Sequence, residues 1–353
     1  MNGNETPLVS VFTPVYNGAA YLRECIESVL TQTYPNWEYV ILNNASTDGS
    51  LEIATEYAAR DARIRVHSND ELLPVVKNHN KAISLACAAA RYCKPLMADD
   101  WMFPDALQKL VAAATRHSSI GLVCAMAFDG TNVLWDGWPY PAERVSGREV
   151  CKPTLEHKLY VFGASSTMMF RADLVRKRKP FFNEAHVHTD VEACFDVLQE
   201  SDFAYVHQVL SYNRVHAQSV TSAADSVQSI RAVHLYLLYK YGPVYLTPEE
   251  FAAQERIELR DYYSMLANEA LHFRDAKFWN LHESLIAQAG QTLDPQRLRR
   301  AVALRALQSV ARHPINVLRS LVFNRRWLKR IRPAGASAPP QRRTPQTSDR
   351  TPS

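Results

Sequence analysis

The sequence predicts an α/β fold: a mostly parallel sheet flanked by helices, followed by a C-terminal α-helical region. Two observations support this prediction. Over residues 8–100, short apolar runs rich in β-branched residues alternate with stretches whose apolar residues recur at helical spacing. After about residue 226 only the helical pattern continues. Because strands that alternate with helices form βαβ units, the first pattern favours a parallel sheet.

The predicted elements can be followed along the chain. Four strands, LVSVFTP, WEYVILN, RIRVHS and KPLMA, are separated by helices in AAYLRECIESVLTQT, from about 49 to 59 and from about 75 to 90. A helix over 105–116 follows, with Pro104 at its first turn, and then the strand IGLVCAMAF. The segment 129–165 is less regular and rich in Gly, Pro and Trp. After it come the strand-like SSTMMFR, a helix around 189–200 and the strand-like FAYVHQVLSYNRV.

Three regions are expected from these patterns. An α/β domain occupies residues 1–225 and has two halves, about 8–100 and about 101–225. Residues 226–330 form the helical region. Residues 331–353 are rich in Pro, Ser and Thr, so they cannot bury enough apolar surface to become ordered.

Composition excludes several classes of protein. Of the 353 residues 47% are apolar, and 40 Lys and Arg against 36 Asp and Glu leave a charge too small and too evenly spread to predict nucleic-acid binding. The six cysteines lie far apart, without the clustered Cys and His of a zinc site, so we expect reduced thiols in a cytoplasmic protein. No apolar run reaches the roughly 20 residues of a membrane span, and the N-terminus lacks a signal-peptide pattern.

Polar residues follow four of the predicted strands. They are TPVYN at 13–17, NNASTDG at 43–49, SNDE at 68–71 and ADD at 98–100. Ligands of open parallel sheets bind beyond the carboxyl ends of the strands, so we expect these loops to converge on one site. The pair Asp99 and Asp100 also allows a simpler interpretation as a helix cap or a solvated turn, since acidic residues are favoured near helix N-termini.

The order of the motifs resembles a known family. The stretch VSVFTPVYNGAAYLRECIESVLTQTYPNWEYVILNNASTDGS is similar to an opening strand, a Pro-x-Tyr-Asn loop, a helix, a turn and a nucleotide-binding loop. The later stretches KNHNKAIS, LMADD, GASSTMMFR, HVHTDVEACFDVL and SYNRVHAQSVT are similar to further motifs of the same family. Over roughly residues 8–222 the chain therefore resembles the GT-A-fold family 2 glycosyltransferases, which transfer a sugar from a nucleotide diphosphate sugar. The resemblance implies the GT-A (nucleotide-diphospho-sugar transferase) sheet, with a nucleotide-binding first half and an acceptor-binding second half.

The resemblance implies that the acidic pair binds the donor. Asp100 is assigned to a divalent metal, Mn²⁺ or Mg²⁺, and Asp99 to the ribose or the donor sugar. A hard cation suits this position because it neutralises the charge on the departing pyrophosphate. The family often has a further Asp where this chain has Met97, so the number of carboxylates at the donor stays open. His216 matches a position that can complete the metal or pyrophosphate site, although a histidine satisfied at a loop surface is the alternative.

Five more residues are assigned to the donor by the same resemblance. Pro14, Tyr16 and Asn44 are placed at the nucleobase, Asp48 in the nucleotide-binding loop and Asn80 at a helix start. Family members frequently have Asp in place of Asn44, whose amide oxygen can accept from the N3–H of a pyrimidine. This favours a UDP or dTDP sugar. Asn is also common in turns that bind no ligand.

Asp190 is the candidate catalytic base. Inverting transfer needs a base within hydrogen-bond reach of the acceptor hydroxyl. Asp190 lies where the family usually has Glu-Asp and this chain has Thr-Asp, just ahead of an amphipathic helix. The competing interpretation is a helix N-cap, a role that Thr189 could also take. His188 and Glu192 are the nearest alternative bases.

The segment 298–333 interleaves Arg with Leu, Val and Trp327. It can lie on a membrane surface as a pair of amphipathic helices, which would suit a lipid-linked acceptor. Equally, its apolar stripe can pack on the catalytic domain while the arginines stay in solvent. Pro314 is expected to break or kink it.

The expected function is metal-dependent, inverting sugar transfer to a hydroxyl of a glycan or lipid-linked acceptor, in bacterial surface polysaccharide synthesis. The expected location is the cytoplasm, with peripheral contact at the inner face of the cell membrane. A catalytically silent nucleotide-binding or scaffold protein of the same fold is the alternative, motivated by Met97, Asn44 and the missing Glu-Asp. No GxGxxG, P-loop or Gly-x-Ser-x-Gly motif supports a dinucleotide-binding, NTPase or hydrolase function. The sugar, the acceptor and the oligomeric state stay open.

Overall fold

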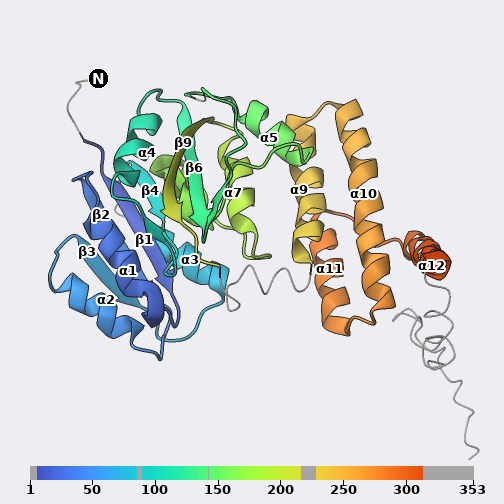
Figure 1. Ribbon diagram of the computed structural model, residues 1–353, viewed down its shortest axis with the longest axis horizontal. Coiled ribbons are helices and arrows are strands. Elements are labelled where there is room, and N and C mark those ends of the chain that lie inside the picture. Colours follow the sequence, from blue (N-terminus) through green and yellow to red (C-terminus); the bar gives the residue numbers. More distant parts are fainter. Residues whose placement is uncertain (1–5, 86–89, 142, 216–227, 313–353) are drawn as a thin grey trace, which may run out of the picture.

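The computed structural model describes residues 6–85, 90–141, 143–215 and 228–312. Figure 1 shows a twisted sheet with helices on both faces, and beside it a group of long helices formed by the C-terminal part of the chain. The strands are β1 Val9–Val15, β2 Trp37–Asn43, β3 Ile64–Ser68, β4 Tyr92–Pro95, β5 Trp101–Met102, β6 Ile120–Asp129, β7 Asn132–Leu134, β8 Met168–Arg171 and β9 Asp202–Tyr212.

The helices alternate with these strands up to β9 and then follow one another. In the first part they are α1 Ala19–Leu30, α2 Ser50–Ala58, α3 Val75–Ser84, α4 Ala106–Ala114, α5 Gly147–Leu155, α6 Ala172–Arg176 and α7 Thr189–Val197. The C-terminal region contains α9 Ser229–Tyr245, α10 Pro248–Leu271, α11 Ala276–Gln288 and α12 Pro295–Arg312.

The sheet is mixed but mostly parallel, as predicted. Its strand order is β3-β2-β1-β4-β8-β6-β9-β5, with β7 paired to β6. Strands β3, β2, β1 and β4 are parallel, and so are β6 and β9, whereas β8 runs antiparallel to both β4 and β6. Because β8 is reversed, the turn that precedes it lies at the edge where β1, β2 and β4 end. This turn is η1, Ser165–Thr167.

The structure differs from the prediction in several places, among them the unpredicted β5 and α6. The predicted strand KPLMA ends at Pro95, and the chain leaves the sheet before Asp99. The segment 129–165 contains β7 and α5, which the predicted irregular segment did not include. Helix α5 starts with a capping box between Ser146 and Glu149, whereas Pro153 and the flanking Gly and Pro residues disguise its helical pattern.

The core has two parts because side chains alternate between the faces of the sheet. From β1, Val9 and Val11 pack with α1 and α4, whereas Phe12 packs on the opposite face with α3 and α7. That second cluster continues into α9, where the Tyr241 ring stacks on Phe195 of α7 with 5.1 Å between centroids. The helical region therefore shares a core with the sheet domain.

At the far edge of the sheet, β5 pairs antiparallel with β9 and places Trp101 directly opposite Tyr212. The two rings are nearly parallel, at an interplanar angle of 8° with 5.4 Å between centroids. Trp101 is the residue after Asp100, so this aromatic pair adjoins the acidic loop.

Several sequence expectations concern residues near the ends of the helical region. Helix α12 ends at Arg312 among the described residues; Leu298 and Ala301 pack against the core, and Leu304 and Leu307 are exposed. Pro314, Trp327 and residues 331–353 lie outside the described residues. The described cysteines are buried free thiols. None of the described helices is long and apolar enough to cross a bilayer.

Candidate active site

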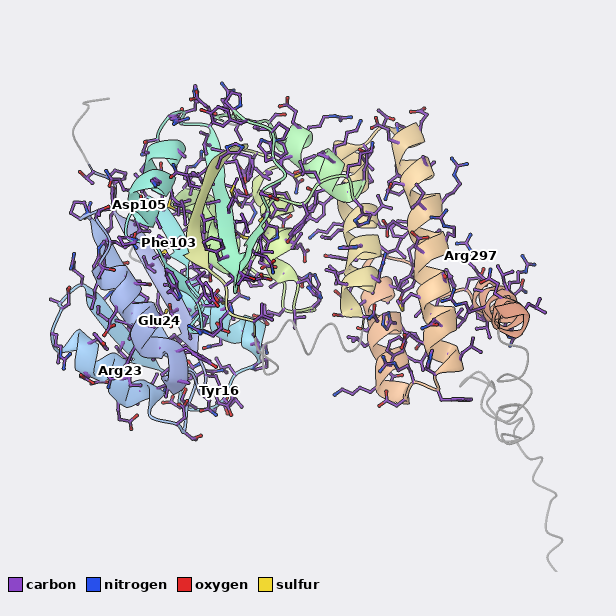
Figure 2. All side chains as sticks on the ribbon, viewed as in Figure 1. Tyr16, Arg23, Glu24, Phe103, Asp105 and Arg297 are labelled. Atoms are coloured by element: carbon purple, nitrogen blue, oxygen red, sulfur yellow. The ribbon has the colours of Figure 1, made fainter. Side chains whose placement is uncertain are left out.

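The loop after β1 is fastened to the loop after β2. Pro14 is buried within β1, and Tyr16 follows that strand with 51% of its side chain exposed (Figure 2). The Asp48 carboxylate accepts hydrogen bonds from the N–H of Ala19 at 2.9 Å and from the N–H and hydroxyl of Ser50 at 3.1 and 2.6 Å. Asp48 therefore ties together the first turns of α1 and α2, with both carboxylate oxygens engaged.

Asn44 belongs to a network of buried amides. Its Nδ2 donates to the carbonyl of Leu73 at 2.9 Å, and its Oδ1 accepts from the N–H of Leu73 at 3.0 Å and from Nδ2 of Asn69 at 2.7 Å. Asn69 Nδ2 also donates to Asn78 Oδ1 on α3 at 3.0 Å. In the protein alone, the Asn44 amide thus holds the loop after β3 in place.

The loop that carries the acidic pair is supported from within the sheet. Thr13 Oγ1 donates to the carbonyl of Leu96 at 2.7 Å and lies 2.8 Å from the Tyr39 hydroxyl. Cys25 Sγ donates to the carbonyl of Met97 at 3.4 Å. Burial raises the pKa of the Cys25 thiol to about 12, so it remains a neutral donor. These contacts fix the backbone just before Asp99.

Asp99 and Asp100 lie in different surroundings. Asp100 is 5% exposed, and its carboxylate accepts from Ser166 Oγ at 2.5 Å, from Asn213 Nδ2 at 3.0 Å and from the N–H of Arg214 at 2.9 Å. Burial and the adjacent charge of Asp99 raise the pKa of Asp100 to about 7. Asp99 is only partly buried. Of the pair, Asp99 is therefore the carboxylate placed nearer to solvent.

Asp190 is joined to the same edge of the sheet. It lies in the first turn of α7, and its Oδ2 accepts from the hydroxyl of Ser165 at 3.0 Å. The N-cap position of α7 is His188, which makes no capping hydrogen bond through its side chain. Asp190 Oδ1 does accept from the N–H of Val191 at 2.9 Å in the same first turn, so Asp190 has a local structural contact besides its bond to Ser165.

Asn80 joins α3 to the segment that leads into α7. Its Nδ2 donates to the carbonyl of Phe182 and its Oδ1 accepts from the N–H of Phe182, both at 2.8 Å. Glu192, one alternative base, is buried and accepts from Asn183, His186, Tyr236 and Lys240. His188, the other, lies 3.0 Å from the hydroxyl of Ser229 on α9. Of these three candidate bases, Asp190 is the one whose carboxylate is hydrogen-bonded to η1, the turn that also binds Asp100.

Four residues of the site were not assigned a role from the sequence: Lys94, Ser166, Asn213 and Arg214. Arg214 donates through Nε to the carbonyl of Asp99 at 3.1 Å and pairs with Glu24 of α1 at 2.5 Å. Lys94 is buried, and burial lowers its pKa to about 7 against the opposing effect of Asp100. A lysine inside the apolar run YCKPLM is unusual, and this could have indicated from the sequence that Lys94 has a role in the site.

A divalent cation is compatible with this edge, because carboxylate oxygens are the ligands that Mg²⁺ and Mn²⁺ prefer. Asp99 and Asp100 both offer such oxygens, and those of Asp100 also accept three hydrogen bonds from the protein. Within the described ranges, no three His, Cys, Asp or Glu side chains gather into a metal site. His216 lies outside the described residues.

Comparison with protein families identifies the region that carries this edge. The model of glycosyl transferase family 2 matches residues 10–178, which include the acidic pair and the turn before β8. Residues 10–178 form a family 2 glycosyltransferase domain. The glycosyltransferase domain thus contains every strand from β1 to β8.

Relatives support the same assignment. EpsH of Bacillus subtilis (strain 168), a protein named as a glycosyltransferase, is 30% identical over 224 residues, covering 61% of this chain and 63% of EpsH. TuaG of the same strain, named for teichuronic acid biosynthesis, is 36% identical over 137 residues, covering 38% of this chain and 52% of TuaG. The chain therefore spans less than two thirds of each of these relatives.

A solved structure supports the fold. The crystal structure of S. aureus TarS in complex with UDP-GlcNAc superposes with a TM-score of 0.59 at 18% identity, covering 92% of this chain and 93% of that one. The likeness extends beyond the glycosyltransferase domain into the helical region. It confirms the predicted GT-A fold.

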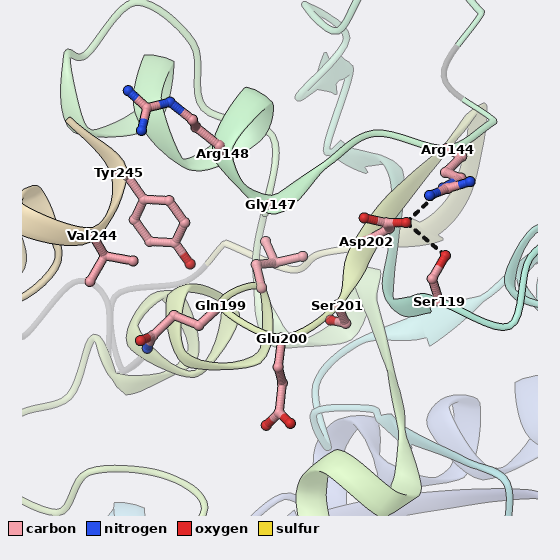
Figure 3. Close-up of a pocket in the computed structure, with 11 residues that line it drawn as sticks. Ser119, Arg144, Gly147, Arg148, Gln199, Glu200, Ser201, Asp202, Val244 and Tyr245 are labelled. Atoms are coloured by element: carbon pink, nitrogen blue, oxygen red, sulfur yellow. Dashed lines mark hydrogen bonds and ion pairs between the residues drawn. The ribbon is translucent and has the colours of Figure 1, made fainter. Parts of the chain in front are cut away.

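A pocket of about 490 Å³ lies at the opposite edge of the sheet, where β6 and β9 begin. In it, Asp202 accepts from Ser119 at 2.6 Å and from Arg144 at 2.7 Å (Figure 3). Because Asp99 and Asp190 belong to the carboxyl edge, this pocket is separate from the candidate active site.

Proposed function

We propose that the protein is a metal-dependent, inverting glycosyltransferase that moves a sugar from a UDP or dTDP sugar to a hydroxyl of a glycan or lipid-linked acceptor. One observation carries the proposal. At the carboxyl edge of a family 2 domain, Asp100 and Asp190, which are far apart in the chain, bond to consecutive serines of one turn. A donor carboxylate and an acceptor base are thereby held in one site.

On the donor side we place Asp100 at the cation and Asp99 at the ribose or the donor sugar, as the family resemblance implies. A bound Mn²⁺ or Mg²⁺ would supply charge neutralisation for the departing diphosphate. Tyr16 and Pro14 border the nucleobase, and Asn44, Asp48 and Asn80 keep the surrounding loops in position. We also place His216 at the metal or the pyrophosphate, as the resemblance implies. The UDP-GlcNAc in the TarS complex supports a uridine donor.

On the acceptor side, Asp190 takes the proton of the attacking hydroxyl as the bond between the anomeric carbon and the diphosphate breaks with inversion. The name of TuaG supports a bacterial surface glycan as the product. Exposed Leu304 and Leu307 on α12 support peripheral contact of 298–333 with the inner face of the cell membrane.

Calorimetric titration with UDP, dTDP and GDP, each with and without Mn²⁺, tests the donor site. Wild type is expected to bind one pyrimidine nucleotide in a metal-dependent manner, Asp100→Ala to lose the metal dependence, and Asp105→Ala to match wild type. Asp105 is the control because it lies on the same segment and pairs with Lys109 at the surface. Absence of binding to all three nucleotides would contradict the proposed mechanism. Binding without donor consumption in the presence of glycan and lipid-linked acceptors would favour the silent protein.

A further inference from the structure

Both candidate carboxylates, Asp100 and Asp190, are hydrogen-bonded to the turn η1. Ser165 Oγ donates to Asp190 at 3.0 Å, and Ser166 Oγ donates to Asp100 at 2.5 Å. Ser166 Oγ also accepts from the N–H of Met97 at 3.0 Å. Because the serines are consecutive, any displacement of this turn moves the partners of both carboxylates together.

The buried amino group of Lys94 holds the turn against the sheet. Lys94 lies on β4, is 1% exposed, and donates from Nζ to the carbonyl of Ser166 at 2.5 Å and to the carbonyl of Pro95 at 2.8 Å. Strand β4 is paired on both sides, with β1 and with β8. The anchor point is therefore part of the centre of the sheet.

A lysine is an unfavourable choice here for stability alone. Removing an amino group from water costs folding free energy, and the two acceptors of Lys94 are carbonyl oxygens rather than a carboxylate. An apolar side chain of similar length would avoid burying an amino group, but it would leave the carbonyls of Ser166 and Pro95 without this donor. Elsewhere among the described residues no lysine is buried. The position of the turn is what Lys94 maintains.

We propose that Lys94 is a positioning residue which, by holding the carbonyl of Ser166, sets the separation and orientation of the Asp100 and Asp190 side chains. It contacts neither substrate and acts through η1. The kinetic consequence rests on the proposed function, but the anchoring of the turn does not.

Lys94→Met is the test variant, and Ser201→Ala, which removes a buried hydroxyl at the opposite edge of the sheet, is its control. Amide hydrogen exchange measured by mass spectrometry is expected to be about tenfold faster in Lys94→Met within residues 163–168 and 186–194. Ser201→Ala should match wild type there. Because Lys94→Met leaves the carbonyls of Pro95 and Ser166 without this donor, its thermal midpoint is expected to fall modestly; a cooperative transition well above the assay temperature separates positioning from loss of folding.

Turnover is measured as UDP released from UDP-GlcNAc with Mn²⁺. In Lys94→Met we expect kcat to fall about 10- to 100-fold while KM changes less than about threefold. Ser165→Ala should lower kcat less in the Lys94→Met background than in wild type, because both changes disturb the same turn.

Unchanged exchange in both segments of Lys94→Met overturns the proposal, as does unchanged kcat in an enzyme that releases UDP. If wild type releases no UDP, that donor assignment fails, and the exchange data alone decide whether Lys94 anchors the turn. The two failures are thus distinguishable.

Discussion

At the scale of single residues, adjacent positions in the chain have opposite surroundings. Asp100 points back into the protein and accepts hydrogen bonds from the turn before β8 and from the end of β9. Asp99 stays partly exposed, with its carbonyl bonded to Arg214. Burial thus gives two neighbouring carboxylates different surroundings: Asp100 is held by the protein on several sides, and Asp99 lies nearer to solvent.

Asp190→Asn tests the base directly. Asn keeps the size of the side chain and can still accept from Ser165, but it cannot take a proton. We expect UDP release from UDP-GlcNAc to slow by about 10²- to 10⁴-fold while calorimetric affinity for UDP stays within about twofold.

The matched control for this change is Asp196→Asn, on the same helix but partly exposed beside Lys240. It should retain wild-type turnover. If Asp190→Asn retains more than about a tenth of the wild-type rate, the base lies elsewhere.

The sequence could assign a role in the site only to residues that lie within a motif shared with the family. Asp99, Asp100 and Asp190 follow recognisable segments, and the structure places all three at one edge. Lys94 and Ser166 could not be paired from the sequence, because their contact depends on β8 lying antiparallel beside β4. Local periodicity carries no information about that neighbour.

At the scale of elements, helix α7 is attached to α9 through Glu192. This buried carboxylate accepts from Tyr236 at 2.6 Å and Lys240 at 2.5 Å on α9, and from His186 at 2.7 Å. Burial alone would raise the pKa of Glu192, but the hydrogen bonds from His186, Lys240 and Tyr236 outweigh it and lower the pKa to about 2. The helix that carries Asp190 is thereby joined to the helical region.

This lowered pKa predicts an acid dependence of stability. The ionised Glu192 stabilises the fold above its ordinary pKa of 4.5, and that contribution, up to about 3 kcal/mol, is lost as pH falls from 4.5 toward 2. Glu192→Gln should be less stable than wild type at pH 7 and should lose less stability across that window.

Urea denaturation followed by circular dichroism at pH 7, 4.5 and 3 measures both effects. Glu249→Gln, at an exposed position in α10, serves as the control and should follow wild type at each pH. Parallel pH curves for wild type and Glu192→Gln would mean that Glu192 does not have the lowered pKa.

At the scale of the whole molecule, the sheet domain and the helical region depend on one another. Figure 1 shows α9 beside α5 and α7, and Phe195, Tyr241 and Tyr245 lie in one continuous core cluster. A chain that ends at residue 225 would expose the apolar surface of α7 that α9 covers. We expect this truncated chain to aggregate or to bind the dye ANS strongly, unlike the full chain.

Light scattering and ANS fluorescence of the two chains measure this difference. A truncated chain that is monomeric, unfolds cooperatively and binds no ANS would show that the sheet domain is independent. The predicted boundary at about residue 225 would then also be a folding boundary.

The architecture was largely predictable, because strands and helices of the first half alternate with clear periodicity. The order of strands across the sheet was not, since β8 inserts between β4 and β6 from a distant part of the chain. Helix α5 escaped prediction because Pro153 and neighbouring Gly residues weaken its pattern. The strand order depends on contacts between residues that are remote in sequence, whereas α5 was missed because of its local composition.

Trp101, which stacks on Tyr212 beside the acidic loop, is expected to report donor binding through its intrinsic fluorescence. An indole one residue from Asp100 should change its emission when UDP and Mn²⁺ alter the nearby field, and Trp101→Phe should abolish that change while nucleotide affinity stays the same. An identical change in Trp101→Phe would trace the signal to another tryptophan. Otherwise, donor occupancy could be followed in real time without a label or a known acceptor.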